Sequence, residues 1–166
     1  MVKNTGYIFK LIIGKIFMEG REIIVEVNKD IKVGLGPEGD VLKTDLVAYS
    51  IVLALYDQKT KKGYMLNHAD ISANPLEFVI HDVIEQAHGK ENVIAYARGG
   101  VMDSQDQETN KIVGRNRSFV EKVFEDHLHP DNYNILWLPD KHFLDYMALH
   151  TGDGRLEARV LGFHEI

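Results

Sequence analysis

The chain contains no cysteine. This absence excludes disulfides, thiolate metal sites and thiol-based catalysis, and it leaves the redox state of the compartment undetermined. A surplus of basic residues is missing too, because the formal net charge at pH 7 is −6. Nucleic acids and anionic membranes select for clustered Lys and Arg, so neither is expected as the main partner.

A hydrophobic segment long enough to cross a membrane is also lacking. Residues 1–20 look apolar, but Lys10 and Lys15 interrupt them and no small-residue cleavage site follows. We therefore expect a cytoplasmic protein without membrane insertion. The length of 166 residues and the charged content of 27% are typical of one globular domain, here residues 1–166.

The segment from Thr44 to His68 is the most informative part of the sequence. An almost unbroken apolar run (46–56) is followed by a polar turn and a shorter apolar run (63–68). Such runs predict two antiparallel strands that are buried on both faces. This hairpin would bring the hydroxyls of Thr44 and Ser50 and the imidazole of His68 into one neighbourhood. The alternative is purely structural, with Ser50 hydrogen-bonded inside a sheet and His68 at a strand end.

The remaining segments predict further strands and two helices. Asn74, Pro75 and Glu77 together indicate a helix start, and Gly89 offers its stop. A second amphipathic helix is expected over 114–127. Further strands are expected at 7–17, 22–28, 31–35, 92–97, 133–138, 143–150 and 155–162. The order predicts an α+β fold, a layered sandwich of a largely antiparallel β core covered by two main helices.

Two polar segments carry acids or histidines without a metal-ligand pattern. The residues 103–111 (DSQDQETNK) lack the glycine turn of an EF-hand, so we expect an exposed loop. His127 and His129 are two residues apart at a helix end and cannot share a helical face. We expect no metal and no other cofactor.

Several short motifs occur in order from Ile31 to the C-terminus, and together they resemble a known family. They are Val33-Gly34-Leu35-Gly36, Thr44, Ala48-Tyr49-Ser50-Ile51, Leu55-Tyr56-Asp57, the stretch 63–68, Ala97-Arg98-Gly99-Gly100 and Ile112-Val113-Gly114-Arg115-Asn116. The resemblance is to the chemotaxis protein CheD family of chemoreceptor glutamine deamidases, which is related to the deamidase toxins of the cytotoxic necrotizing factor type. It makes residues 31–166 a CheD-like core and residues 1–30 an N-terminal extension.

The resemblance implies a catalytic triad of Ser50, His68 and Thr44. The nucleophilic cysteine of the family falls on Ser50, and its threonine falls on Thr44. The family histidine aligns with Asn67, unless the turn at 58–62 carries one extra residue. Because insertions in such turns are easily tolerated, we expect His68 to take the role of the histidine.

Four further residues match family motifs outside the triad, namely Gly99, Gly100, Arg115 and Asn116. The glycines are expected to form a tight turn that leaves a buried strand, or to allow close approach of a substrate. The Arg–Asn pair is expected to cap the second helix or to brace the loop near the site.

The implied activity is conversion of a protein Gln side chain to Glu with release of ammonia. The target in the chemotaxis branch would be a helical chemoreceptor segment. Serine holds its proton more tightly than cysteine, so His68 would have to remove it during attack. Ser50 therefore has three interpretations: a natural or engineered Cys-to-Ser change that silences the site, a working Ser–His hydrolase, or a noncatalytic homologue that docks a chemotaxis phosphatase or receptor.

Overall fold

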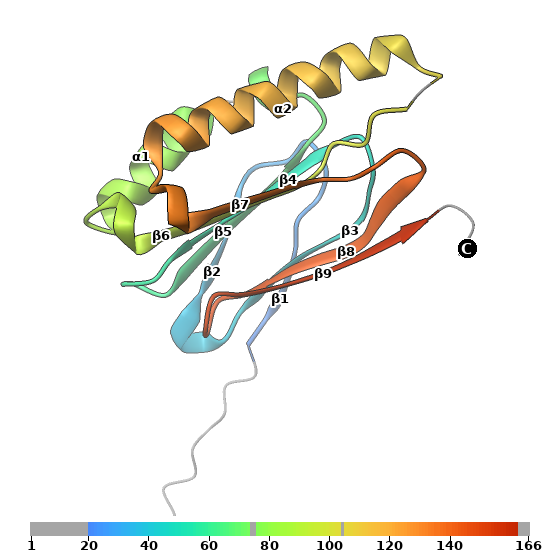
Figure 1. Cartoon of the computed structure of the whole chain (residues 1–166). Coiled ribbons are helices and arrows are strands. Elements are labelled where there is room, and N and C mark those ends of the chain that lie inside the picture. Colours follow the sequence, from blue (N-terminus) through green and yellow to red (C-terminus); the bar gives the residue numbers. More distant parts are fainter. Residues whose placement is uncertain (1–19, 74–75, 104, 163–166) are drawn as a thin grey trace, which may run out of the picture.

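A computed structural model describes residues 20–73, 76–103 and 105–162, and they form three layers (Figure 1). Helices α1 (Leu76–Gln86) and α2 (Gln107–His127) lie side by side over one sheet, and a second sheet lies beneath it. The predicted α+β layered sandwich is confirmed. The strand predicted at 7–17 lies outside the described residues.

The sheet beneath the helices has five strands in the order β2-β5-β4-β6-β7. All neighbours are antiparallel except β6 and β7, which run parallel. The bounds are β2 (Lys32–Leu35), β5 (Lys62–His68), β4 (Ile51–Asp57), β6 (Val93–Gly99) and β7 (Tyr133–Trp137).

The second sheet has four strands in the order β1-β3-β8-β9, with only the β1–β3 pair parallel. The bounds are β1 (Glu22–Ile24), β3 (Val41–Val47), β8 (His142–His150) and β9 (Arg155–Gly162). Short 3-10 turns connect several elements: η1 (Gly36–Glu38), η2 (Ile71–Ala73), η3 (Lys90–Asn92) and η4 (Pro130–Asn132).

Strand β4 is buried on both faces, as the apolar run predicts. Alternate residues of a strand point to opposite faces. One set joins the core under the helices, and the other set joins the core between the sheets; these sets are Ile51, Leu53 and Leu55, and Val52, Ala54 and Tyr56. The strand is therefore the shared wall of two hydrophobic cores.

The apolar run at 46–56 is not one strand. β3 ends at Val47 and β4 begins at Ile51, and the two strands belong to different sheets. The bend at 48–50 carries the chain from one sheet to the other, and Leu46 just before it has a left-handed φ of 51°. Ser50 consequently lies on a crossing segment.

Helix α2 begins at Gln107 rather than at the predicted Gly114. Asp106 caps it, because its Oδ1 accepts a hydrogen bond of 3.0 Å from the backbone N–H of Thr109. Part of the loop expected at 103–111 therefore forms the first helical turns. The strand expected at 22–28 is shorter than predicted, since β1 covers only Glu22–Ile24.

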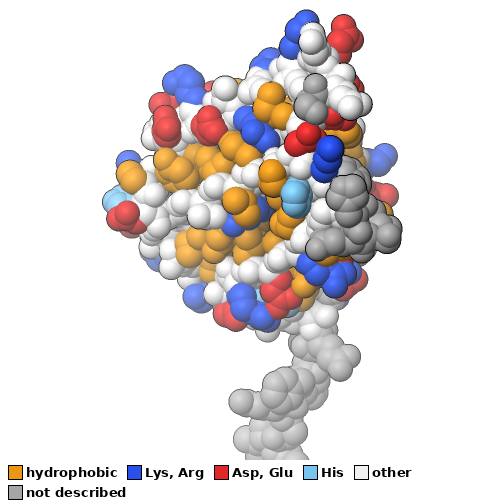
Figure 2. Space-filling view, turned by 45° about the vertical axis from the view of Figure 1, so that its right-hand side comes forward, with side chains coloured by type: hydrophobic (Ala, Val, Ile, Leu, Met, Phe, Trp, Pro, Cys, Tyr) orange, Lys and Arg blue, Asp and Glu red, His pale blue; other side chains and the backbone are white. Residues whose placement is uncertain are grey.

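On the face shown in Figure 2, hydrophobic side chains gather in a hollowed central region, with Lys, Arg, Asp and Glu around its rim. Several large hydrophobic residues are exposed, including Leu136 of β7 at 50% and Val160 of β9 at 36%. Neither helix in the described part of the chain combines the length and hydropathy that a membrane crossing requires.

Candidate functional site

Thr44 places a hydroxyl in the core between the two sheets. It lies on β3 opposite Met147 of β8 and is 2% exposed. A buried hydroxyl needs a hydrogen-bond partner, because burial without one carries a free-energy cost. The partner comes from the other sheet.

That partner is Asn67 of β5. Its Nδ2 donates a hydrogen bond of 3.0 Å to Thr44 Oγ1, and both residues are buried. The other amide atom, Oδ1 of Asn67, has no hydrogen-bond partner among the described residues. An unpaired buried acceptor costs about 1–3 kcal/mol. The Thr44–Asn67 pair is therefore an incompletely satisfied polar centre of the inter-sheet core.

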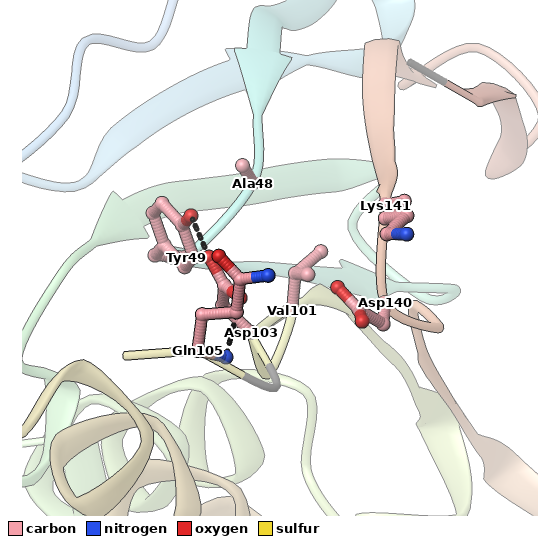
Figure 3. A pocket seen from close by; sticks show the side chains of 7 residues that line it. All are labelled: Ala48, Tyr49, Val101, Asp103, Gln105, Asp140 and Lys141. Atoms are coloured by element: carbon pink, nitrogen blue, oxygen red, sulfur yellow. Dashed lines mark hydrogen bonds between the residues drawn. The ribbon is translucent and has the colours of Figure 1, made fainter. Parts of the chain in front are cut away.

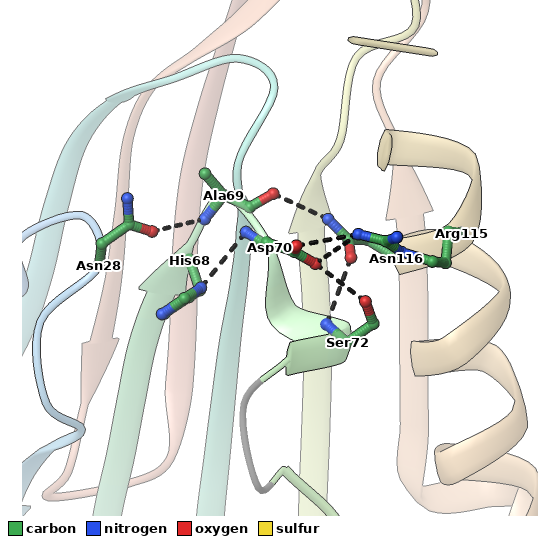
Figure 4. Close-up of polar contacts among 7 residues, drawn as sticks. All are labelled: Asn28, His68, Ala69, Asp70, Ser72, Arg115 and Asn116. Atoms are coloured by element: carbon green, nitrogen blue, oxygen red, sulfur yellow. Dashed lines mark hydrogen bonds and ion pairs between the residues drawn. The ribbon is translucent and has the colours of Figure 1, made fainter. Parts of the chain in front are cut away.

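His68 points to the other face of β5. It follows Asn67 directly, and the pairing of β4 with β5 is regular from Asp57↔Lys62 to Ile51↔His68. Ile51 belongs to the core under the helices. The Nδ1 of His68 accepts a hydrogen bond of 3.3 Å from the backbone N–H of Asp70 (Figure 4).

The structure thus brings Thr44 together with Asn67, and among the described residues no hydrogen bond joins His68 to Thr44 or to Ser50. The turn between β4 and β5 is closed by Asp57, whose Oδ1 accepts hydrogen bonds from the N–H groups of Lys59 (2.8 Å) and Thr60 (3.1 Å). The register of β4 with β5 is regular through Asn67 and His68, so these two side chains point to opposite faces of β5.

Ser50 is almost buried, at 8% exposure, directly before β4. Its carbonyl accepts a hydrogen bond of 2.9 Å from the N–H of Gly100. Gly99 has a left-handed φ of 99°, and a Cβ there would lie 2.4 Å from the Ser50 carbonyl oxygen. The Gly99–Gly100 pair therefore forms the tight turn expected at the end of β6, against the backbone of Ser50.

The hydroxyl of Ser50 is not hydrogen-bonded to a base among the described residues. A base must lie within hydrogen-bond reach to take the proton of a serine nucleophile. Within the described ranges, no residue hydrogen-bonds to the Ser50 side chain. Asn67 and Arg98, the buried polar residues that pair with Val52 two positions after Ser50, carry an amide and a guanidinium, and neither group accepts a proton at neutral pH. The side chains of Ser50, Asn67 and Thr44 are thus a hydroxyl, an amide and a second hydroxyl.

A pocket of about 210 Å³ opens beside the Ser50 crossing segment (Figure 3). Its lining includes Ala48, Tyr49, Asp103, Asp140 and Lys141. The Tyr49 hydroxyl donates a hydrogen bond of 3.4 Å to Asp103 Oδ2. Burial raises the pKa of Tyr49, and the charges of nearby acids, Asp103 first, raise it further. The pocket is therefore more acidic than basic.

Arg115 and Asn116 brace the chain between β5 and α1, one of the two roles expected for them. Arg115 Nη2 contacts both carboxylate oxygens of Asp70 at 2.9 and 3.0 Å (Figure 4). Asn116 is fully buried; its Nδ2 donates to the carbonyl of Ala69 at 2.8 Å, and its Oδ1 accepts from the N–H of Ser72 at 3.2 Å. The hydrogen bond from the Ser72 hydroxyl, and then Arg115, lower the pKa of Asp70. α2 is thus fastened to the loop after His68.

The sequence did not single out Asp70, Asp140 or Lys141. None of them belongs to a motif, and they meet other residues only through the tertiary fold. Among the described residues, no group of three or more His, Asp and Glu side chains is arranged to hold a metal ion.

Comparison with known proteins does not assign the chain to a family. No protein-family model matches the chain. No curated protein matches it in sequence. Among solved structures, it is similar to the crystal structure of the hypothetical protein YfiH from Bacillus licheniformis, with 10% sequence identity and a TM-score of 0.37. The similarity covers 58% of this chain and 50% of YfiH, so the chain matches half the length of that structure.

Proposed function

We propose that the chain is a catalytically silent relative of the CheD-like glutamine deamidases and acts by binding a protein partner. One observation carries the proposal: an amide, that of Asn67, contacts Thr44 at the position where the family's histidine aligns. The CheD-like identity rests on the ordered motifs of the sequence.

The chemistry of deamidation supports a silent site. Hydrolysis of a carboxamide needs a nucleophile, a group that takes and returns a proton, and donors for the oxyanion. Ser50 supplies a hydroxyl, but neither Asn67 nor Thr44 can take its proton at neutral pH. In this alignment a hydroxyl, that of Ser50, replaces the family's thiol, and an amide, that of Asn67, replaces its imidazole, so the site has no group that takes a proton at neutral pH.

The resemblance suggests the class of partner, a helical chemoreceptor segment or a chemotaxis phosphatase. A contact surface is available at the crossing segment between the sheets. Leu46 and Tyr49 are 72% and 41% exposed there, next to the acidic pocket. Exposed apolar side chains that rim a polar pocket are typical of protein-binding sites.

Calorimetric titration tests this role with the full chain against two probes, the cytoplasmic domain of a chemoreceptor and a chemotaxis phosphatase from the same genome. We expect binding to at least one probe, and Leu46→Asp should weaken it. Leu136→Asp, at a leucine on β7 that is 50% exposed, is the control and should have no effect. His68→Ala should also leave binding and cellular behaviour unchanged. Failure of both probes to bind, or loss of function in a folded His68→Ala protein, would contradict the proposal.

Glutamine deamidation itself is the second candidate. The Ser50 hydroxyl favours it, because that hydroxyl has no competing hydrogen bond in the described structure and lies on the segment that lines the pocket. If the site is a deamidase, Ser50→Cys should release ammonia from a Gln-bearing chemoreceptor domain, and His68→Ala should abolish that release. A silent site predicts that Ser50→Cys alone stays inactive and that Asn67→His must be added before activity is regained.

A further inference from the structure

One edge of the β-sandwich, between β7 and β9, has apolar side chains that are only partly covered. β6 contacts β8 across the two sheets, so the outermost strands next to them, β7 and β9, lie at the same edge (Figure 1). Figure 2 looks onto this side of the molecule, where hydrophobic side chains line a hollow. The apolar residues of this β7–β9 edge are Leu136 (50% exposed), Val160 (36% exposed) and the half-buried Ile94, Tyr96 and Leu156.

The side chains of this edge point into the space between the sheets. Leu136 pairs with Arg98 of β6, and Arg98 pairs in turn with Val52 of β4. Val52 belongs to the inter-sheet core, and residues paired across strands project from the same face of a sheet. On the other sheet, Leu156 pairs with Leu149 of the same core. Arg98 therefore places a positive charge within the apolar edge.

The guanidinium of Arg98 has no acidic partner in the described part of the chain. Arg98 is 9% exposed, and its guanidinium carbon lies 5.8 Å from the ring centroid of Tyr96. Its hydrogen bonds go to neutral oxygens, and no described residue forms an ion pair with it. Burial lowers the pKa of Arg98, which shows that the group has lost hydration. Buried charges are ordinarily paired, because it is costly to remove an unpaired charge from water.

The hydrogen bonds of Arg98 leave one pair of its donors free. Nη1 donates to the carbonyls of Ala97 at 2.8 Å and Asn134 at 2.9 Å, and Nη2 donates to Asn134 Oδ1 at 2.6 Å. A guanidinium has five N–H donors, so the N–H of Nε and the second N–H of Nη2 remain, and no described residue accepts from them. Because Asn134 takes the donors at the end of the guanidinium, the free ones are the parallel pair along its side. That pair matches the two oxygens of a carboxylate.

The free donors and the apolar side chains together select the class of ligand. An uncharged apolar molecule would cover Leu136 and Val160 but would leave the guanidinium without a counter-ion. A small hydrophilic anion would pair with Arg98 but would leave the apolar side chains exposed to water. A molecule with one carboxylate and a hydrocarbon chain satisfies both parts, in the manner of apolar sites in which a few polar groups fix the orientation of the ligand.

We propose that the β7–β9 edge binds an aliphatic monocarboxylate, whose carboxylate pairs with the side-on donors of Arg98 and whose hydrocarbon chain lies between Leu136 and Val160. This inference goes beyond the proposed docking role and does not rest on it. The β7–β9 edge shares no residue with the acidic pocket or with the exposed Leu46 and Tyr49.

Calorimetric titration of the full chain at pH 7 with three ligands of equal chain length tests the inference. We expect saturable binding of decanoate, and binding of decanol and decylammonium that is at least about tenfold weaker, because only the carboxylate accepts from both free donors. Equal binding of decanoate and decanol would reduce the interaction to apolar adsorption and overturn the inference. Absence of saturable decanoate binding would overturn it as well.

Two variants locate the site, and a third is the control. Arg98→Lys keeps the positive charge but removes the paired donors, and we expect it to bind decanoate at least about tenfold more weakly. Leu136→Asp, at an exposed position, should weaken binding to a similar degree. Val33→Asp, at a valine that is 43% exposed on β2 at the opposite edge of the same sheet, should bind as the unaltered chain does. Unchanged affinity in folded Arg98→Lys, or in Leu136→Asp where Arg98→Lys does not fold, would overturn the inference.

Two other occupants of the edge are outcomes of further measurements. A dimer that Leu136→Asp dissolves would assign the edge to a second copy of the chain and overturn the inference. Glu165 follows β9 in the sequence and lies outside the described residues. Binding of decanoate to Glu165→Gln but not to the unaltered chain would assign Arg98 to the chain's own acid, and it would also overturn the inference. Each of these results leaves the proposed docking role unchanged.

Discussion

Asn67 donates a hydrogen bond to Thr44 across the two sheets, with Nδ2 and Oγ1 3.0 Å apart. In the proposed CheD-like alignment, Thr44 takes the place of the family's threonine, and Asn67 takes the place of its histidine when no residue is inserted. The pair contains no group that exchanges a proton at neutral pH.

Thr44→Val should destabilise the fold, because it leaves the Asn67 side chain buried without any hydrogen bond among the described residues. The expected loss in free energy of unfolding is about 1–3 kcal/mol. The double variant Thr44→Val, Asn67→Leu removes both polar partners and should be more stable than the single variant. Urea denaturation measures both. A double variant less stable than Thr44→Val would mean that the pair is not an isolated polar unit.

Gly99→Ala should be harmful, since the residue has a φ of 99° and its Cβ would lie 2.4 Å from the Ser50 carbonyl oxygen. We expect a loss of about 1–3 kcal/mol or more. Gly114→Ala is the matched control: it lies within α2, and its Cβ would meet only Met102 Cε, at 3.9 Å. That control should gain about 0.5–1 kcal/mol from helix propensity. Thermal unfolding of the two variants should shift in opposite directions.

Protonation of Asp40 in acid should lower the free energy of unfolding. The hydrogen bond from Arg21, the largest cause, lowers the pKa of Asp40 to about 2 from its ordinary value of 3.8. A lowered folded-state pKa contributes stability that is complete above about pH 4 and is lost as the pH falls through about 2. Because Arg21 is well exposed, the contribution should be about 1–2 kcal/mol. Asp40→Asn should lose that part of the pH dependence, measured as melting temperature from pH 2 to 5, and an unchanged profile would contradict this assignment.

The two brace residues on α2 should differ in effect. Arg115→Ala removes an ion pair whose side chains are 56% and 42% exposed, so the loss should not exceed about 1 kcal/mol. Asn116→Ala removes two hydrogen bonds from a buried residue and should cost about 2 kcal/mol or more. Chemical denaturation compares them. A larger loss for Arg115→Ala would show that the ion pair is the main fastening.

The sequence predicts those elements that a run of apolar residues or a group of turn residues marks. β4 is almost entirely apolar, β5 has an apolar middle (Gly63–Leu66), and the closing hairpin of β8 and β9 has a clear turn. β3 is missed because Lys43 and Asp45 alternate with Leu42 and Thr44, and because its end runs into the apolar residues of the crossing segment. Composition does not reveal where a chain leaves one sheet for another.

The candidate site depends on strand register. A shift of one residue moves every side chain of a strand to the opposite face, so His68 and Asn67 are adjacent in sequence but point to opposite faces of β5. The choice between them rests on the length of one turn, which the sequence alone leaves open. The hydrogen bonds of Asp57 close that turn within this chain. The brace between Asp70 and Arg115 joins residues 45 positions apart and has no local signal.

Intact-mass analysis of a Gln-bearing chemoreceptor domain, incubated with the unaltered chain, tests the central claim most directly. A catalytically silent site predicts no conversion of Gln to Glu and no ammonia, and the same result for Ser50→Cys alone, because no described residue forms a hydrogen bond with the side chain at position 50 through which it could take the proton. Conversion by the unaltered chain, abolished in Ser50→Ala, would contradict it.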